Sequence, residues 1–277
     1  MTTVGFVSLV RKWVTNLQRY FINQNADESQ RFFITNKEDI HHIKNVMRQS
    51  EGQQIVTTFN DQNVYTCEII HIGDQEIEIE LIEKQDIDTE LPQHITICSG
   101  LIKADKYEWM IQKATELGAS EFIAVEMQRS IVKLNSTKAS KKLERWQKII
   151  KEAAEQSYRL TIPHISYLSN SKSICDIINQ YDYVLVAYEE EAKHGEISHF
   201  KHMLKQFKPQ DHVLLIFGPE GGLSDEEVSM LKPHSQLVGL GPRILRAETA
   251  PLYTLGALSY EKELMGWTIC PQLRFTL

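Results

Sequence analysis

The sequence predicts an α/β protein whose larger, second part is built on a mostly parallel sheet and whose first part is a small β-barrel. Three observations support this prediction. Short alternating strands fill residues 17–83, and beyond them strands and helices alternate along the chain. Several later strands, such as HVLLIFG at 212–218, are almost continuously apolar, which is typical of strands covered on both faces.

The first part reads as strands joined by turn residues. Asn60-Asp61 and Gly73-Asp74 provide the turn chemistry between them. Asn36 is expected to cap one helix at Glu38–Arg48. The expected strands are β-branched or alternating segments at 17–22, 30–35, 52–59, 63–72 and 75–83. Five or more short strands with one helix predict a barrel.

The boundary between the two parts is expected in a polar stretch at 85–93, which contains Pro92. We therefore predict a docking barrel at 17–90 and a second domain at 91–277. Residues 1–16 carry their positive charges after the apolar part, which is the wrong order for a signal peptide. They are expected to be a loosely ordered extension whose deletion leaves folding and activity intact.

The second part alternates strands and helices. Gly118 is placed to end a helix at 105–117, and Ser224 with Glu227 forms a capping-box pattern. Thr249 is expected to cap a helix that runs to about Leu264. A further helix is expected at 140–158. Strands are expected at 94–102, 121–127, 182–189, 212–218 and 236–241. This order predicts a sheet with helices on its faces.

Composition narrows the class of protein. The four cysteines show no CxxC spacing and the ten histidines show no ligand spacing, so neither a metal site nor a disulfide framework is expected. No apolar run approaches the length of a membrane span. We expect a cytoplasmic protein that uses no metal and no membrane.

The net charge of −7 hides a strongly basic segment. Residues 129–151 carry eight Lys or Arg and a single acidic residue, Glu144. Such a segment can hold a phosphate backbone even on an acidic protein. The alternative is a solvated helix face rich in lysine.

Two loops at expected strand ends are the candidate ligand site: GPEGG at Gly218–Gly222 and LGPRILRAETA at Leu240–Ala250. Open α/β sheets bind ligands at the carboxyl ends of their strands. GPEGG lacks the lysine of a P-loop and the spacing of a dinucleotide fingerprint. The second loop mixes apolar side chains with Arg246 and Glu248, which suits an aromatic, partly polar ligand. A tight structural turn is the alternative for either loop alone.

At this point the motifs resemble a known family. GPEGGLSDEE at 218–227 and LGPRILRAETA at 240–250 resemble the last two motifs of the SPOUT, or trefoil-knotted, methyltransferases. Over residues 17–277 the chain is similar to the 16S ribosomal RNA uracil-N3 methyltransferases, with LQRYF, HHIKNVMR, KADKYEWMIQKATELGA, RSIVK and EAAEQSYR in the family's order. Departures are Asn60-Asp61 for Asp-Gly, Met47 for Leu and Ala247 for Thr, and the last leaves a hydroxyl role in doubt.

The resemblance implies a PUA-like barrel that docks RNA and a knotted SPOUT domain that binds S-adenosylmethionine and forms a homodimer. It implies methylation of N3 of a specific uridine in 16S ribosomal RNA of the small ribosomal subunit. The implied cofactor contacts are Ala187, Tyr188, Glu189, Phe217, Gly218, Pro219, Glu220, Gly221, Leu240, Gly241, Ile244, Leu245, Arg246 and Thr249.

Methyl transfer from a sulfonium needs two reactants held in line and no nucleophilic side chain. We expect Arg246, or as a second choice Arg159, to stabilise charge on the uracil carbonyls, and Glu248 or Glu220 to take the proton. The alternative for Glu248 is a helix-capping role, and for Arg159 a charge at a helix C-terminus. The candidate phosphate contacts are Arg19, Arg129, Lys133, Lys141, Lys142 and Arg145.

Two other functions stay open. A knotted methyltransferase could act on another RNA atom, such as a ribose 2′-oxygen or a guanine. An RNA-binding assembly factor without catalysis is the alternative from a different class, and it would not bind S-adenosylmethionine.

Overall fold

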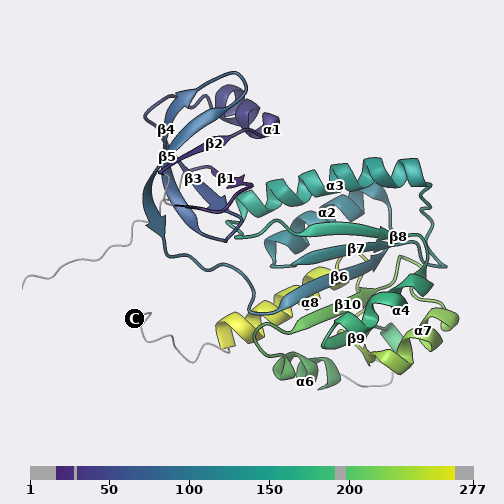
Figure 1. Cartoon of the computed structure of the whole chain (residues 1–277). Helices are drawn as coiled ribbons and strands as arrows, with labels where there is room; N and C mark the ends of the chain where they lie inside the picture. Colours follow the sequence, from purple (N-terminus) through teal and green to yellow (C-terminus); the bar gives the residue numbers. More distant parts are fainter. Residues whose placement is uncertain (1–16, 28–29, 191–197, 266–277) are drawn as a thin grey trace, which may run out of the picture. The chain divides into compact units, whose positions relative to one another are not determined.

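The computed structural model describes residues 17–27, 30–190 and 198–265. It contains two compact units that divide between Ile87 and Asp88, three residues before the boundary expected from the sequence. The extension expected at residues 1–16 lies outside the described residues. Each unit has its own sheet and its own core (Figure 1).

The first unit is a curved five-stranded sheet. Its strands are β1 (Arg19–Ile22), β2 (Arg31–Ile34), β3 (Gln54–Phe59), β4 (Val64–Ile72) and β5 (Ile77–Gln85), in the order β1-β3-β4-β5-β2. The end strands bury Tyr20 and Phe32 in the same core, together with Ile55 and Ile69 of the central strands. A sheet whose two edges share one core must curl around it, as the predicted barrel requires.

The helix of this unit differs from the expected one. Asn36 caps it as predicted, since its Oδ1 accepts hydrogen bonds from the amides of Glu38 and Asp39 at 2.9 and 3.2 Å. However, α1 (Lys37–His41) gives way to a π-helical segment, η1 (His42–Val46), and does not run to residue 48. Tertiary contacts account for the change. Ile43 is fully buried, and His42 Nδ1 lies 2.9 Å from Tyr20 Oη.

The second unit contains the predicted parallel sheet. Six strands lie in the order β11-β9-β10-β6-β7-β8, and every pair is parallel. Their bounds are β6 (His94–Gly100), β7 (Glu121–Val125), β8 (His164–Leu168), β9 (Tyr183–Ala187), β10 (His212–Phe217) and β11 (Gln236–Val238). The edge strand β8 was missed from the sequence because only Ile165 of its five residues is buried, so no apolar run marks it.

Helices cover both faces of this sheet. One core joins Ile97 and Leu215 of the strands to helices α2, α3, α6 and α8, and the other joins Cys98 and Ile216 to α4 and α7. Neighbouring residues of β6 and β10 therefore face opposite cores, which explains their continuous apolar runs. The helices are α2 (Ala104–Glu116), α3 (Ser136–Gln156), α4 (Ile174–Ile177), α6 (Ser198–Gln206), α7 (Asp225–Leu231) and α8 (Ala250–Ser259). Three short 3-10 helices are η2 (Ser171–Ser173), η3 (Ile178–Gln180) and η4 (Lys232–His234), and a π-helical segment, η5 (Tyr260–Met265), follows α8.

Local signals set several helix ends. Gly118 follows α2 with φ at +98°, as its predicted C-terminal role requires. The capping box is complete, because Ser224 Oγ accepts from the Glu227 amide and the Glu227 carboxylate accepts from the Ser224 amide. The long helix α3 starts four residues before the expected Ser140, since Asn135 Oδ1 caps it by accepting from the Lys138 amide at 2.9 Å.

The parallel strands β9, β10 and β11 bring the loops that follow them to one edge of the sheet. Residues 188–190, 218–222 and 240–249 gather there.

In the part of the chain that the structure describes, no helix combines the length and apolar character needed to cross a membrane.

Candidate functional site

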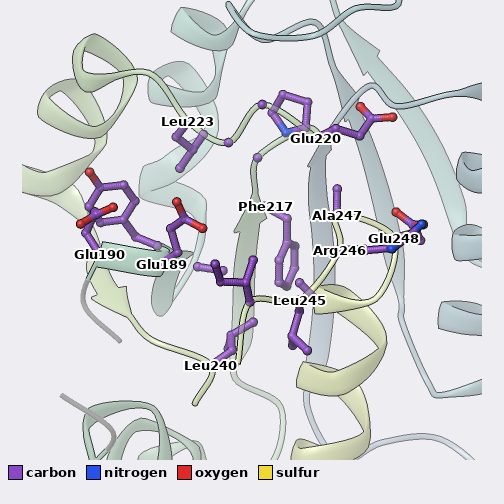
Figure 2. Close-up of a pocket in the computed structure, with 18 of the residues that line it drawn as sticks. Glu189, Glu190, Phe217, Glu220, Leu223, Leu240, Leu245, Arg246, Ala247 and Glu248 are labelled. Carbon is purple, nitrogen blue, oxygen red and sulfur yellow. The ribbon is translucent and has the colours of Figure 1, made fainter. Parts of the chain in front are cut away.

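A cavity of about 790 Å³ lies where these three loops meet (Figure 2). Lys106 of α2 and Arg129, from the loop after β7, complete its wall. This volume is typical of a site for a small molecule or cofactor. Its position at the carboxyl ends of parallel strands is where open α/β sheets bind ligands.

The glycine-rich loop follows β10 in a tight turn. Gly222 has φ at +70°, and its amide donates to the Pro219 carbonyl at 2.8 Å. A Cβ atom on Gly218 would lie 2.9 Å from backbone atoms of Gly222 and Leu223. The sequence therefore uses glycine here because the chain folds back on itself, and this leaves backbone rather than side chains against the cavity.

Arg129 braces this loop from behind. Its Nη1 donates to the carbonyls of Gly221 at 3.2 Å and Leu223 at 2.9 Å. The adjacent Gln128 amide donates to Glu227 Oε1 at 2.9 Å, so the loop after β7 is tied to the N-terminus of α7 as well. The side chain of Arg129 is also exposed, so the contact with RNA phosphate expected from the sequence stays a prediction beside this supporting role.

Glu227 is held ionised by its hydrogen bonds. Burial raises the pKa of this carboxyl, but hydrogen bonds from the amides of Ser224 and Gln128 and from serine hydroxyls outweigh it. The net pKa therefore lies below the ordinary value. The support of the loop depends on this charge.

An apolar surface divides the cavity. Phe217 lies near its middle, with Leu240 and Leu245 below it, while Glu189 and Glu190 lie on one side (Figure 2). Arg246 and Glu248 lie together on the opposite side. The cavity thus offers an apolar wall between two charged regions.

The charged side near Arg246 contains a closely paired carboxylate. Glu248 Oε1 lies 2.9 Å from Lys106 Nζ, and the Glu248 side chain is only 11% exposed. Burial raises the pKa of Glu248, but the hydrogen bond from Lys106, the residue's own amide and the charge of Arg246 together lower it below its ordinary value. Arg246 itself is exposed to the cavity.

Glu220 connects the glycine loop to α2. Its Oε1 accepts from the Lys103 amide, at the start of the helix, at 3.3 Å. The side chain of Lys103 itself makes no capping hydrogen bond to this helix. A carboxylate at this position also meets the positive end of the helix dipole.

The structure brings together most of the residues expected to contact the cofactor. All of them except Thr249 line the cavity. Thr249 stands at the N-terminus of α8, but its side chain makes no capping hydrogen bond, so its expected capping role is wrong. Gly222, Pro242, Arg243, Ala247 and Ala250 line the cavity within the two loops expected to form it, and the lining residues that the sequence did not suggest are Lys106, Glu190, Leu223 and Asp225. Lys106 stands inside the quoted motif KADKYEW, which was the available signal.

Arg159 does not reach the cavity. It is 2% exposed, and its Nη1 donates to the carbonyls of Thr115 at 2.8 Å and Ala119 at 2.9 Å. Its Nε lies 2.9 Å from both carboxylate oxygens of Glu90, and Glu90 Oε1 also accepts from the amides of Leu160 and Thr161. The second-choice catalytic role is therefore corrected to a structural one. Arg159 anchors the start of the second unit, which explains why that unit begins before residue 91.

The expected phosphate contacts differ in availability. Lys142 and Arg145 both pair with Glu108, at 3.2 and 2.7 Å, and the Arg145 hydrogen bond is the largest effect that lowers the pKa of Glu108. Lys133 is 75% exposed and Lys141 is exposed. Arg19, by contrast, is 3% exposed within β1. A buried guanidinium cannot bind a phosphate backbone, so that expectation is corrected.

Among the described residues, no group of three or more His, Cys, Asp or Glu side chains is arranged to hold a metal ion. The cavity instead combines backbone, apolar and charged groups of both signs. It suits a ligand with an aromatic part and separated charges.

Comparisons with known proteins agree with this geometry. A family model for an RNA methyltransferase domain matches residues 89–259, and a model for an RNA methyltransferase PUA domain matches residues 34–82. The chain is 46% identical to ribosomal RNA small subunit methyltransferase E of Bacillus subtilis, over 90% of this chain and 98% of that protein. It is 30% identical to the protein of the same name from Mesomycoplasma hyopneumoniae, over 86% and 97% of the two chains.

A solved structure resembles most of the chain. The ribosomal RNA small subunit methyltransferase E of Neisseria gonorrhoeae, bound to S-adenosyl methionine, is 26% identical with a TM-score of 0.75. The similarity covers 89% of this chain and 98% of that one.

Proposed function

The chain belongs to the RNA methyltransferase family whose curated members are named ribosomal RNA small subunit methyltransferase E, and we propose that it methylates N3 of a specific uridine in 16S ribosomal RNA. The methyl donor is S-adenosylmethionine. The observation that carries the proposal is a single cavity formed by both family motifs at the carboxyl ends of parallel strands. We further propose that the protein acts in the cytoplasm on the small ribosomal subunit.

The cavity fits this cofactor. The backbone of Gly218–Gly222 approaches it without side chains, and Phe217, Leu240 and Leu245 offer an apolar surface to an adenine ring. Glu189 supplies negative charge that suits a sulfonium or ammonium group. These residues would hold the cofactor, which supplies an electrophilic methyl group when bound.

Arg246 is the proposed stabiliser of charge on the substrate base. When N3 of uracil loses its proton, negative charge spreads over the two flanking carbonyl oxygens. The exposed guanidinium of Arg246 stands at the cavity and can donate hydrogen bonds to such an oxygen. The arginine is part of the second family motif.

Glu248 is the proposed acceptor of the N3 proton. It is ionised because Lys106 and Arg246 lower its pKa, and it lies beside Arg246 on the same side of the cavity (Figure 2). A carboxylate with a lowered pKa is a weak base, so it depends on the neighbouring cations to make N3 more acidic. The methyl group gained at N3 then replaces the proton that passes to Glu248.

RNA docking is assigned to the barrel and to the exposed basic residues of the second unit. Lys133 and Lys141 are exposed, and among the described residues their single ion pair is the long one from Lys133 to Glu126 at 4.0 Å. Lys142 and Arg145 would have to share their charge with Glu108. The first two are therefore the stronger candidates for phosphate contacts.

We also propose a homodimer formed through the second unit. Exposed apolar side chains lie on α8 and η5 and on the adjacent α2: Tyr253, Tyr260, Leu264, Met265 and Trp109. Exposed apolar groups of this kind mark protein interfaces. Sedimentation of the purified protein should give twice the chain mass, and Tyr260→Asp should shift it toward the monomer.

The test is methylation of small ribosomal subunits by the purified protein, followed by mass spectrometry of the digested RNA. The proposal expects one 3-methyluridine for each 16S molecule. A 2′-O-methyl nucleotide or a methylguanine as the product would instead show a knotted methyltransferase that acts on another RNA atom. Failure to bind S-adenosylmethionine in calorimetry would favour the assembly-factor reading instead.

A further inference from the structure

Three charged side chains form a compact group on one side of the cavity. Lys106 Nζ lies 2.9 Å from Glu248 Oε1, and the charge of Arg246 acts on the same carboxylate. Lys106 comes from α2, whereas Arg246 and Glu248 come from the loop before α8, and all three line the cavity. Lys106 and Arg246 are hydrogen-bond donors, and Glu248, which interacts with both of them, is an acceptor.

These groups match the edge of uracil on which N3 lies. The edge presents the two carbonyl oxygens as acceptors and the N3–H between them as a donor. We propose that Lys106 hydrogen-bonds one uracil carbonyl, so that Lys106, Glu248 and Arg246 together read the uracil edge. This inference rests on the proposed function and adds a specificity-determining residue to it. Cytosine, which places an amino group at one of these positions and an acceptor at N3, mismatches the group at two points.

Lys106 has the free donors that this role requires. An ammonium group has three N–H donors, and Glu248 takes one of them. Among the described residues, no other partner accepts from Lys106. Its side chain is 29% exposed, so the remaining donors are within reach of a ligand in the cavity.

The helix fixes the position of this lysine. Its neighbours Tyr107 and Met110 are buried in the core that joins α2 to the sheet, so the Lys106 backbone cannot move away from the cavity. Glu248 Oε2 has no hydrogen-bond partner in another described residue. That oxygen is also buried, so it stays without such a partner unless a ligand or a water molecule donates to it, which a purely structural salt bridge would not require.

The test uses the full chain and ribosomal RNA that carries uridine, 2-thiouridine or 4-thiouridine at the target position. Lys106→Met should slow single-turnover methylation of the uridine substrate roughly 10- to 100-fold, the loss expected for one hydrogen bond to a charged group. Its affinity for S-adenosylmethionine in calorimetry should not change. Lys106→Arg should restore most of the rate, because a guanidinium keeps the charge and the donors.

The matched control is Lys113→Met. Lys113 lies on the same helix and also forms a salt bridge, with Glu116 at 2.7 Å, but it does not line the cavity. It should methylate at the wild-type rate. Thermal unfolding of every variant separates loss of chemistry from loss of structure.

The thio substrates show whether Lys106 touches the base. Sulfur is a weak acceptor, so replacing the carbonyl that Lys106 contacts should slow the wild-type protein and leave Lys106→Met unaffected. The other thio substitution should slow both proteins equally. If both substitutions slow both proteins equally, or if Lys106→Met loses cofactor affinity and not rate, Lys106 only holds the loop and the inference is wrong. If the wild-type protein leaves uridine N3 unmethylated, the proposed function itself fails.

Discussion

At the scale of single residues, Arg246 and Glu248 differ in what surrounds them. Arg246 is exposed to the cavity, whereas Glu248 is buried and paired with Lys106 at 2.9 Å. The sequence could suggest both residues because they share one motif. It could not reveal their partner, because Lys106 is more than 130 residues away along the chain and meets Glu248 only in the folded structure.

Arg246→Ala tests the role of the guanidinium. We expect single-turnover methylation to fall by about 10²- to 10³-fold, as when one donor to a developing oxyanion is removed. Calorimetry should show nearly unchanged affinity for S-adenosylmethionine, because the apolar wall and the glycine loop remain. An unchanged rate would contradict the assignment.

Gly218→Ala tests the close approach of the backbone. The new Cβ would meet Gly222 and Leu223 backbone at 2.9 Å, and such overpacking costs about 1–3 kcal/mol. We expect the loop to shift and calorimetry to show cofactor affinity reduced about tenfold or more.

The matched control for that change is Gly256→Ala in α8. Nothing lies within 4 Å of a Cβ atom built there. Alanine should therefore stabilise the helix by about 0.5–1 kcal/mol and leave cofactor binding unchanged. Equal effects of the two substitutions would show that the glycine loop has no special geometry.

At the scale of elements, the capping box at α7 does more than start a helix. Glu227 also accepts from the Gln128 amide, so one carboxylate joins α7 to the loop that braces the glycine turn. The Ser-Glu spacing predicted the box itself. The bond to Gln128 spans 99 residues and follows only from the parallel sheet, in which β6 lies between β7 and β10.

Glu227 should make the stability of the second unit depend on pH. Its pKa in the folded state is below the unfolded value of 4.5, so its contribution is fully present above that value and is lost as pH falls through the folded pKa. Unfolding measured between about pH 6 and pH 3 should therefore show a smaller loss of stability for Glu227→Gln than for wild type.

The control for this pH dependence is Glu226→Gln. Glu226 is exposed on the same helix and accepts only a 3.3 Å bond from the Gln128 side chain. It should keep the wild-type slope. If both variants keep that slope, the ionised Glu227 does not stabilise the fold.

Replacing Arg159 tests whether its pairing with Glu90 stabilises the start of the second unit. Arg159→Met leaves Glu90 without its buried partner, and we expect thermal unfolding to show a loss of about 3–5 kcal/mol. Methylation by the remaining folded protein at low temperature should be normal, because Arg159 does not line the cavity. A fully stable but inactive variant would restore Arg159 as a catalytic residue.

At the scale of the whole molecule, periodicity and turn chemistry predicted the barrel, the parallel sheet and most strands. The edge strand β8 could not be predicted because it buries one residue, and the π-helical segment η1 could not be predicted because its His42 contacts Tyr20, which lies 22 residues earlier in the chain. The burial of Arg19 and Arg159 could not be predicted for a similar reason, since burial of a charged residue is set by distant partners. The trefoil knot implied by the resemblance is a property of chain threading, which periodicity cannot predict.

The central claim is that this molecule methylates N3 of one uridine in 16S ribosomal RNA. Its most direct test is mass spectrometry of 16S RNA from cells that lack the gene, alone and complemented with wild type or Arg246→Ala. The account predicts that one 3-methyluridine disappears in the deletion strain, returns with wild type and stays absent or strongly reduced with Arg246→Ala. An unchanged 3-methyluridine content, or the loss of a different modified nucleotide, would contradict it.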